Sequence, residues 1–282
     1  MMCYRMLAWG FGVALTALAG RAEAGWVIDQ VVRGEGGGSR MQALIQANRI
    51  KNVMQGPDGG PAMAFIMDLN AETIAQVDHQ GRRYRVATFQ EYAQALRGVT
   101  QAVGGQLAEA MRQMREAMKD MPPEQRQAME QMLRSQMGQA GGAPQECQEP
   151  RREVRRTGQR ATIAGYAAER HDVLADGAPE SEVWLAAAID AWREVDLQKL
   201  ERFAAEMAKA MPGCGRGLAR FPGTDPAWRL ANQGYPMRTV HHGAKGTTTE
   251  VTKAERRSIP AAEFQPPPGF ARTTLQEMLG GR

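Results

Sequence analysis

The hydrophobic pattern of this chain changes its period twice, and this change constrains the fold more than any other feature. Between residues 26 and 88, apolar and polar residues alternate in short segments separated by turn residues, which is typical of antiparallel strands. At Phe89 the period becomes about 3.6 residues, which indicates helices. After Cys147 the alternation returns. The pattern therefore predicts an α+β protein whose antiparallel sheet is interrupted by a helical insert at about residues 89–146.

The strand-like segments fall on both sides of this insert. They are residues 26–32, 40–53, 62–69, 74–79 and 82–88 before it, and 154–161, 162–174, 182–188, 235–242 and 247–259 after it. Strong turn chemistry separates several of them, including "GPDGGP" at residues 56–61 and Asp176-Gly177. One further helix is expected over residues 190–211, buried through Leu200, Phe203 and Met207.

The insert holds seven of the eighteen methionines. We expect one helix at residues 89–98, an interruption at Gly104-Gly105 and a second helix at residues 106–121. On that second helix Met111, Met114, Met118 and Met121 fall within a stripe about 80° wide. After Pro122-Pro123 a further helix carries Met129, Met132 and Met137 on a second apolar stripe. The pattern predicts a helical hairpin with two apolar faces.

The N-terminal residues resemble a secretory signal peptide. Arg5 precedes an apolar stretch at residues 7–20, and Ala22-Glu23-Ala24 has the small-x-small pattern of a cleavage site. We expect cleavage between Ala24 and Gly25, which leaves residues 25–282 as a single periplasmic domain. Arg21 stands where a lipoprotein would carry its acylated cysteine, so a lipid anchor is not expected. No later segment is long and apolar enough to predict a transmembrane helix.

Two cysteines remain after removal of the signal, Cys147 and Cys214. In an oxidising compartment two such thiols most often pair. A disulfide between them would stabilise the fold by about 4 kcal/mol in the chain-entropy model. The alternative is two unpaired buried thiols.

The charge pattern argues against nucleic acid as a partner. The formal net charge is +4, from 35 basic and 31 acidic residues. Nucleic-acid-binding proteins usually carry a denser basic patch. The most basic run, residues 151–156, is broken by Glu153 and Val154, and we interpret it as a solvated strand face.

Several short motifs carry a family resemblance. They are Asp68-Leu69, Asp78, Tyr84, Thr157-Gly158, Ile163-Ala164-Gly165-Tyr166, Val183-Trp184, Gly234-Tyr235-Pro236 and Pro267-Pro268-Gly269-Phe270. In these the chain resembles an uncharacterised periplasmic family, the domain of unknown function numbered 4412. It is also similar to the lipoprotein carrier LolA, in which a curled antiparallel sheet forms a half-barrel around helices. The resemblance implies a LolA-like half-barrel with a concave apolar face able to hold acyl chains or an apolar partner.

Catalysis is not expected. The four histidines, His79, His171, His241 and His242, show no metalloprotease spacing, and no nucleophile-elbow motif occurs. We therefore predict no enzyme activity and no cofactor.

The methionines allow a copper interpretation. Met111/Met114 and Met118/Met121 have the spacing of thioether ligand pairs for Cu(I). The same spacing also serves any amphipathic helix, and no His or Cys lies between Met111 and Met137. No metal site is therefore assigned.

The leading functional prediction is non-catalytic binding of an apolar ligand, a lipid or the acyl part of a lipoprotein. The seven methionines of the insert would line or cover the site, because methionine suits surfaces that repack around variable ligands. If Cys147 bonds Cys214, the insert is pinned at its root and can act as a hinged lid. The alternative is an envelope protein-interaction or sensing module that docks a partner through the methionine-rich hairpin. Binding of Cu(I) is a third possibility, and the pattern leaves the oligomeric state open.

Overall fold

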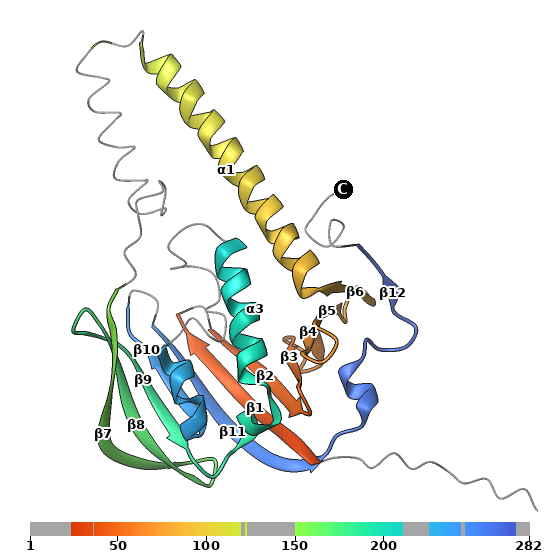
Figure 1. Ribbon diagram of the computed structural model, residues 1–282, viewed down its shortest axis with the longest axis vertical. Coiled ribbons are helices and arrows are strands. Elements are labelled where there is room, and N and C mark those ends of the chain that lie inside the picture. The colour runs from red at the N-terminus through yellow and green to blue at the C-terminus, as the bar shows by residue number, and fades with distance from the viewer. Residues whose placement is uncertain are drawn as a thin grey trace, which may run out of the picture.

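A computed structural model describes residues 24–35, 37–119, 122, 150–210, 226–243 and 246–274. Within these residues one curled sheet surrounds helices that lie in its hollow (Figure 1). The strands are β1 (Ala24–Gly34), β2 (Gly37–Gln46), β3 (Arg49–Gln55), β4 (Pro61–Asp68), β5 (Thr73–Asp78), β6 (Arg83–Thr88), β7 (Arg152–Ile163), β8 (Tyr166–Ala175), β9 (Ala178–Ala186), β10 (Tyr235–His241), β11 (Thr247–Ser258) and β12 (Ala271–Arg272). The helices are α1 (Phe89–Lys119) and α3 (Leu197–Ala210), with short 3-10 turns η1 (Ala191–Glu194), η2 (Pro226–Gln233) and η3 (Ala261–Phe264).

The sheet is open and almost entirely antiparallel. Its strand order is β12-β6-β5-β4-β3-β2-β1-β11-β10-β9-β8-β7, and only β12 runs parallel to its neighbour. The first strand lies near the middle, between β2 and the late strand β11, where Ala24 pairs with Ser258. Because β7 and β12 stand at opposite ends of the order, the sheet does not close. The predicted α+β half-barrel is confirmed.

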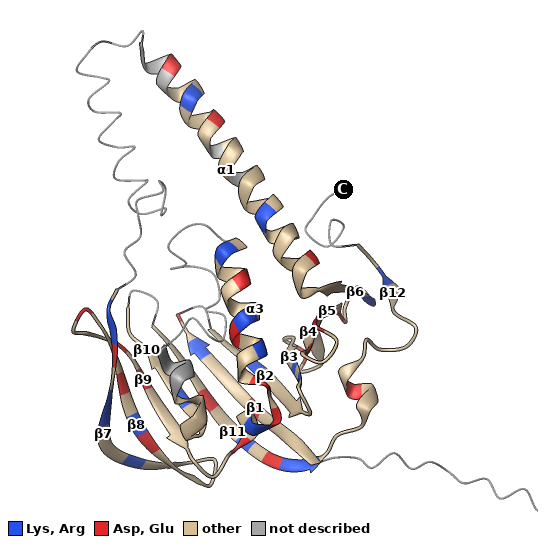
Figure 2. Ribbon diagram, viewed as in Figure 1, with Lys and Arg blue, Asp and Glu red and all other residues tan. Residues whose placement is uncertain are grey.

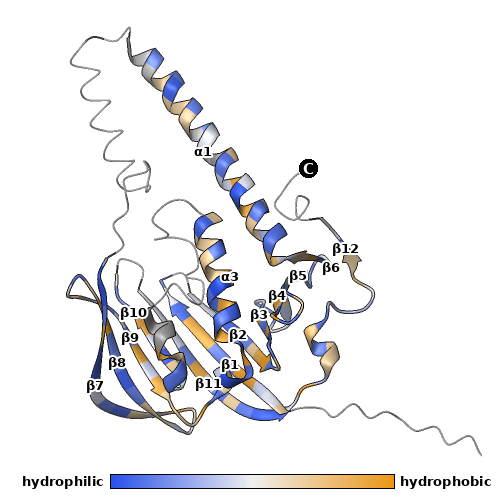
Figure 3. Cartoon of the chain, in the orientation of Figure 1, coloured by the Kyte–Doolittle hydropathy of each residue, from blue (hydrophilic) through white to orange (hydrophobic). Residues whose placement is uncertain are grey.

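Alternation along β1 and β2 divides the sheet into two apolar faces. Trp26, Ile28 and Ile45 belong to one buried cluster, while Val27 and Leu44 belong to another. Neighbouring side chains on a strand point to opposite faces, so these clusters lie on the two sides of the same sheet. Figure 3 shows the apolar residues along these central strands. Each face therefore needs its own cover.

Helix α3 covers the face of the sheet that carries Trp26, Ile28 and Ile45, which is the inner face of the curl. Leu200, Phe203 and Met207 are almost fully buried there, with 1%, 3% and 0% of their surface exposed. Phe89, the first residue of α1, packs against Phe203 with 4.1 Å between the ring centroids. The start of α1 and the whole of α3 therefore share one core with the sheet.

The C-terminal segment, residues 259–272, covers the outer face, which carries Val27 and Leu44 of the second cluster, here called the outer cluster. Ile259 and Phe264 are buried against β1, β2 and β4, and Phe270 packs beside them. The segment then adds β12 to the edge of β6, where the backbone N–H of Ala271 donates to the carbonyl of Arg82 at 2.9 Å. Figure 1 shows this dark-blue segment running past β3 to β6.

Three predicted boundaries are wrong. Residues 40–53 form two strands, because Ala47 and Asn48 adopt φ values of 46° and 63° and turn the chain. Residues 162–174 are likewise divided by a turn at Ala164-Gly165. The helix expected over residues 190–211 is the turn η1 followed by α3, since Val195 is extended.

The predicted break at Gly104-Gly105 is also wrong, because α1 is one helix of 31 residues. Glycine disfavours a helix interior by about 1 kcal/mol relative to alanine, which is too little to end a helix supported on both sides. The second helix of the predicted hairpin, with Met129, Met132 and Met137, lies outside the described residues.

Substitution of these glycines tests the continuity of α1. Nothing lies within 4 Å of a Cβ added at Gly104 or Gly105. Gly104→Ala and Gly105→Ala should each slow amide hydrogen exchange of residues 101–110 by up to about fivefold, because each removes a glycine penalty. Unchanged or faster exchange would mean that the helix is interrupted there.

A second prediction concerns the inner cover. Phe203→Ala should lower the free energy of unfolding by about 3–5 kcal/mol, since it empties a packed position between α1, α3 and the sheet. Glu201→Ala, on the exposed side of the same helix, should change it by less than about 0.5 kcal/mol. Chemical denaturation of both variants measures the difference, and equal effects would contradict this packing.

Candidate functional site

Two of the predicted ligand-binding methionines have described side chains. Met111 is half-buried on α1, and Met114 is 40% exposed. Met118 belongs to the last turns of the same helix. The other predicted ligand-binding residues, Met121, Met129, Met132 and Met137, lie outside the described part of the chain. Of the predicted site, the structure therefore describes the part that lies on the outer half of α1.

Helix α1 extends beyond the body of the protein (Figure 1). Its first turns are held in the inner core through Phe89, Ala93 and Leu96. The hydroxyl of Thr100 donates to the carbonyl of Leu96 at 2.8 Å and lies 3.5 Å from the carbonyl of Ala210, at the end of α3. From residue 101 to residue 116, most residues with a described side chain are exposed. The helix continues to Lys119, so this outer part is about 28 Å long.

The apolar stripe of α1 continues from the buried part into the exposed part. The spacing of three and four residues runs through Phe89, Ala93, Leu96, Thr100, Val103, Leu107, Met111, Met114 and Met118. Residues at this spacing form the line of contact, or seam, of a helix that packs along another helix. The inner end of the seam packs against α3 and the sheet, and Met114 at the outer end is exposed.

The rest of the outer helix is polar and carries both signs of charge (Figure 2). Glu109 pairs with Arg112 and accepts a hydrogen bond from the Gln113 amide at 3.2 Å. Such exposed pairs contribute only a few tenths of a kcal/mol to the helix. Val99 is also exposed, at 41%, close to where α1 leaves the body. The surface offers apolar contact along one stripe and ordinary solvated charge elsewhere.

Helix α3 is fixed firmly at its N-terminal end. The Asp196 backbone N–H donates to Asn48 Oδ1 at 2.7 Å, and the Asn48 N–H donates to the Glu194 carbonyl at 2.7 Å. Lys199 Nζ donates to the carbonyl of Leu69 at 3.2 Å. These bonds join the approach to α3 to the turns that follow β2 and β4. They explain how the helix is directed into the hollow of the sheet.

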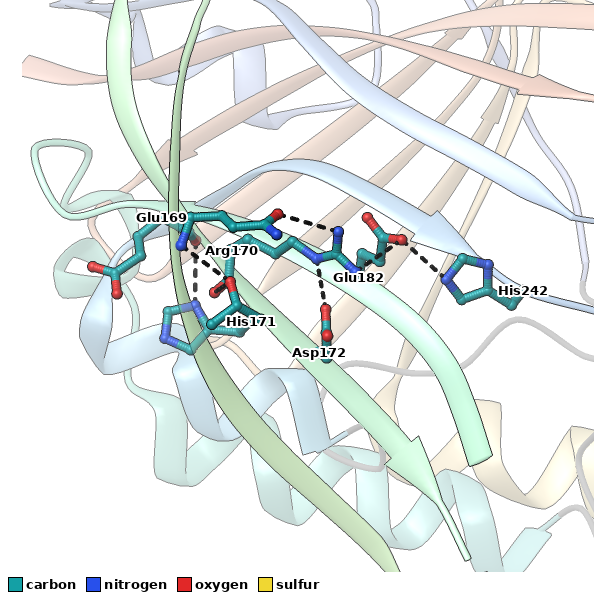
Figure 4. Close-up of polar contacts among 8 residues, drawn as sticks. Glu169, Arg170, His171, Asp172, Glu182 and His242 are labelled. Atoms are coloured by element: carbon teal, nitrogen blue, oxygen red, sulfur yellow. Dashed lines mark hydrogen bonds and ion pairs between the residues drawn. The ribbon is translucent and has the colours of Figure 1, made fainter. Parts of the chain in front are cut away.

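A cluster of charged residues lies on β8, β9 and the end of β10 (Figure 4). Arg170 donates to Asp172 at 2.7 Å and pairs with Glu182 at 3.1 Å. His242 Nε2 lies 3.3 Å from Glu182. His171 is buried nearby, with Nδ1 3.2 Å from the carbonyl of Glu169. The carboxylates are engaged by cations on the same strands, which is the arrangement of a structural ion-pair network.

The histidines are spread over the sheet. His79 follows β5 and packs edge-on against Phe270, with 5.6 Å between ring centroids, while His171 and His242 belong to the network above. Among the residues with described positions, no group of three His, Cys, Asp or Glu side chains is arranged to hold a metal ion. The predictions of no catalytic activity and no resident metal stay predictions.

Two other predicted features, the disulfide and the signal peptide, lie wholly or partly outside the described residues. Cys147 and Cys214 fall outside the described residues, and so does the signal sequence up to residue 23. Ala24 and Gly25, the predicted cleavage site, are the first residues of β1. A Cβ at Gly25 would lie 2.7 Å from the carbonyl oxygen of Ile45, so only glycine fits this position.

A groove on the outer face was not predicted. It lies between β2, β3 and the C-terminal segment, has a volume of about 530 Å³, and includes Lys51 and His79 in its lining. A weak signal was available, because strand alternation places Lys51 on the same face as Val53. The residues that complete the groove, such as Glu263 and Pro267, come from the far end of the chain and could not be assigned to it by spacing.

Comparison with family models identifies the family of this chain. The model of DUF4412, a domain of unknown function, matches residues 97–270. The chain belongs to this family, as the motifs in its sequence predicted. A search of curated proteins finds no match.

Several solved structures align with this chain at low sequence identity. An uncharacterized conserved protein from Thermus thermophilus aligns with a TM-score of 0.41 at 7% identity, over 88% of each chain. PNGF-II aligns at 0.37 and 9% identity, over 90% of this chain and 32% of its own. The complex of Pseudomonas aeruginosa MucA and MucB gives 0.34 and 9% identity, over 86% of this chain and 56% of that one. The latter two matches span well under two thirds of the longer chains, and scores this low carry no argument about function.

None of the helices in the described part of the chain is both long enough and apolar enough to cross a membrane.

The environment of His79 leads to a pH prediction. Burial lowers the pKa of His79, and the positive charge of Lys51 lowers it further, while Asp78 acts in the opposite sense. The unfolded chain therefore binds a proton at His79 more readily than the folded chain does. The contribution of the neutral His79 ring to the free energy of unfolding is complete above about pH 6.5. It is lost as the pH falls through the folded-state pKa.

Measurements of unfolding free energy between pH 7.5 and 5.5 should show a decrease in the wild type that is smaller in His79→Gln. NMR titration of the His79 ring in Lys51→Met should give a pKa above the wild-type value, because a nearby positive charge has been removed. An unchanged pKa in this variant would exclude coupling between the two side chains.

Proposed function

We propose that this protein is a non-catalytic binding protein of the cell envelope, and that it docks a helical segment of a partner protein along the outer half of α1. The observation that carries the proposal is the apolar seam of α1. It is packed at its inner end and continues with the same spacing to Met111 and the exposed Met114. A seam of this spacing is complementary to another helix.

The side chains of the seam support a docking role. Met111 and Met114 are unbranched and polarizable, so they can adapt to the shape of an apolar partner. The charged residues beside them, such as Arg112 and Glu109, are solvated and can form the polar rim of an interface. The inner half of α1 is anchored by Phe89 and Ala93, so the outer half is presented from a rigid base.

Occupation of the hollow by α3 favours partner docking over carriage of an acyl chain. Leu200, Phe203 and Met207 take up space on the inner face that an acyl chain would need. The acyl-ligand function stays a second proposal, supported by the apolar inner face of the curled sheet that α3 fills. A ligand could enter only if α3 moved outward, which would break contacts at both of its ends: those of Asp196 and Lys199 at the start and the Arg97–Glu206 pair near the end.

The proposed envelope location rests on the signal-like N-terminus and its cleavage pattern at Ala24-Gly25. Native mass spectrometry of the protein from periplasm, without detergent, tests location and ligand together. A mass that begins at Gly25 supports export. A lipid-sized addition that is lost on denaturation would support the acyl-ligand proposal, and a copper-sized addition would support binding through thioethers.

The docking proposal is tested by photo-cross-linking in the producing cells. A photoreactive amino acid replaces Met114 in one strain and Gln113, on the polar side of α1, in another. We expect a cross-link to a single partner protein from position 114 and little or none from position 113. The additional change Met111→Glu should reduce the yield about tenfold, because it places a charge in the apolar seam.

Gln113→Glu is the matched control for Met111→Glu in the strain that carries the probe at 114. It introduces the same charge on the same turns of the helix but outside the seam, so the yield should be unchanged. Cross-links confined to the chain itself would show that its own residues fill the seam. Cross-links between two copies would show self-association. Either result would contradict docking of a partner protein.

A further inference from the structure

We infer that the groove on the outer face is a second binding site, which takes a small carboxylate with an apolar body. It lies on the side of the sheet opposite α3 and is independent of the α1 seam. Its volume of about 530 Å³ is within the range of small-molecule sites, which run from about 300 to 1,000 Å³.

The central residue of the groove is Lys51. In the sheet register it lies between Leu44 on β2 and Ile66 on β4, both members of the buried outer cluster. Its side chain is only 12% exposed. A lysine in such surroundings needs an anionic partner to offset the loss of hydration. Within the chain this partner is Glu263, and the exposure of its carboxylate is what would make the Lys51 ammonium accessible to a ligand.

The anionic partner of Lys51 within the chain is readily displaced. Lys51 Nζ lies 2.9 Å from Glu263 Oε2, but the Glu263 side chain is 48% exposed. Turning this carboxylate into water would leave the Lys51 ammonium facing the groove. The carboxylate of a ligand can then take the same position, and the displaced Glu263 carboxylate is left hydrated rather than buried.

The walls supply an apolar surface for the rest of the ligand. Leu44 and Val53 contribute the sheet side, while Pro267 and Pro268 contribute the opposite side. The two prolines lie between Phe264, which is 5% exposed, and Phe270, which packs against His79 and lies under the guanidinium of Arg82 at 5.2 Å. Because proline restricts the backbone and both flanking rings are anchored, this wall is preorganised.

His79 restricts the charge that the groove can neutralise. Its ring lines the groove, and burial together with Lys51 keeps its pKa below the usual range, so it is neutral at pH 7. Lys51 is therefore the cation available to the ligand within the described lining. One ammonium beside apolar walls fits a monoanion better than a phosphate or a dicarboxylate.

The test uses the mature protein and three probes followed by NMR chemical shifts. Octanoate represents a fatty acid, N-acetyl-leucine represents a peptide C-terminus, and octanol is the neutral analogue of the first. We expect saturable shifts in residues 49–55, 79 and 262–268 with one or both carboxylates. The tighter of the two identifies the source of the ligand. Octanol should bind at least tenfold more weakly than octanoate.

Two substitutions should change affinity in opposite directions. Lys51→Met should weaken carboxylate binding tenfold or more, because it keeps the apolar stem and removes the ammonium. Glu263→Gln should strengthen it severalfold, because the internal competitor for Lys51 is neutralised. Lys253→Met, at a 61% exposed lysine on β11, is the control and should leave affinity unchanged.

The inference is overturned if octanol binds as tightly as octanoate, or if no saturable shift appears in the groove at millimolar probe concentration. It is also overturned if Glu263→Gln fails to increase affinity. Should Lys51→Met prove unfolded by circular dichroism, Glu263→Gln alone decides. None of these results depends on the α1 seam, so this site and the proposed docking function can fail separately.

Discussion

The structure depends on covering both faces of one curled sheet. Apolar side chains alternate along β1 and β2 toward an inner and an outer cluster, and neither face could remain in water. Phe203 and Met207 of α3 fill the inner hollow, while Phe264 of the C-terminal segment covers the outside. The two covers differ in kind. A regular helix packs closely against the inner face, whereas an irregular segment rich in proline spans the outer face and leaves a groove beneath it.

This difference separates the two candidate sites. On the inner side, helix α3 covers the apolar face of the sheet. The apolar surface that stays exposed lies on the outer part of α1, at Met114. On the outer side the cover is incomplete, and Lys51 introduces a charge into an apolar face. A macromolecular partner suits the first surface because it is long and convex, and a small molecule suits the second because it is short and concave.

Much of this could be predicted from the sequence, and the exceptions have physical causes. Alternation gave most of the strands, and glycine-rich turns such as residues 56–61 gave several connections. The turn at Ala47-Asn48 was missed because alanine rarely adopts a positive φ. The helix break expected at Gly104-Gly105 failed because local glycine propensity is weaker than a continuous helical segment on both sides.

The two candidate sites differ in how much of each is visible in the sequence. The methionine stripe is a local pattern, readable from spacing alone, whereas the groove joins Lys51 to Glu263 across 212 positions of sequence. A contact of that kind has no periodic signature. Lys51, a charged residue on the same strand face as Val53, was the signal available in the sequence, and it was not used.

The position of β1 has a consequence for how the chain is made. This first strand lies in the middle of the sheet, hydrogen-bonded on one side to β2 and on the other to β11, so that Ala24 meets Ser258. Strands β2 to β6 are joined by short hairpins and can pair as they emerge, but the central junction must wait until almost the whole polypeptide is available. Under the export proposed above, with the N-terminus first, the chain would be unable to complete this pairing during passage. Pairing of the first and eleventh strands would then be among the last steps of folding.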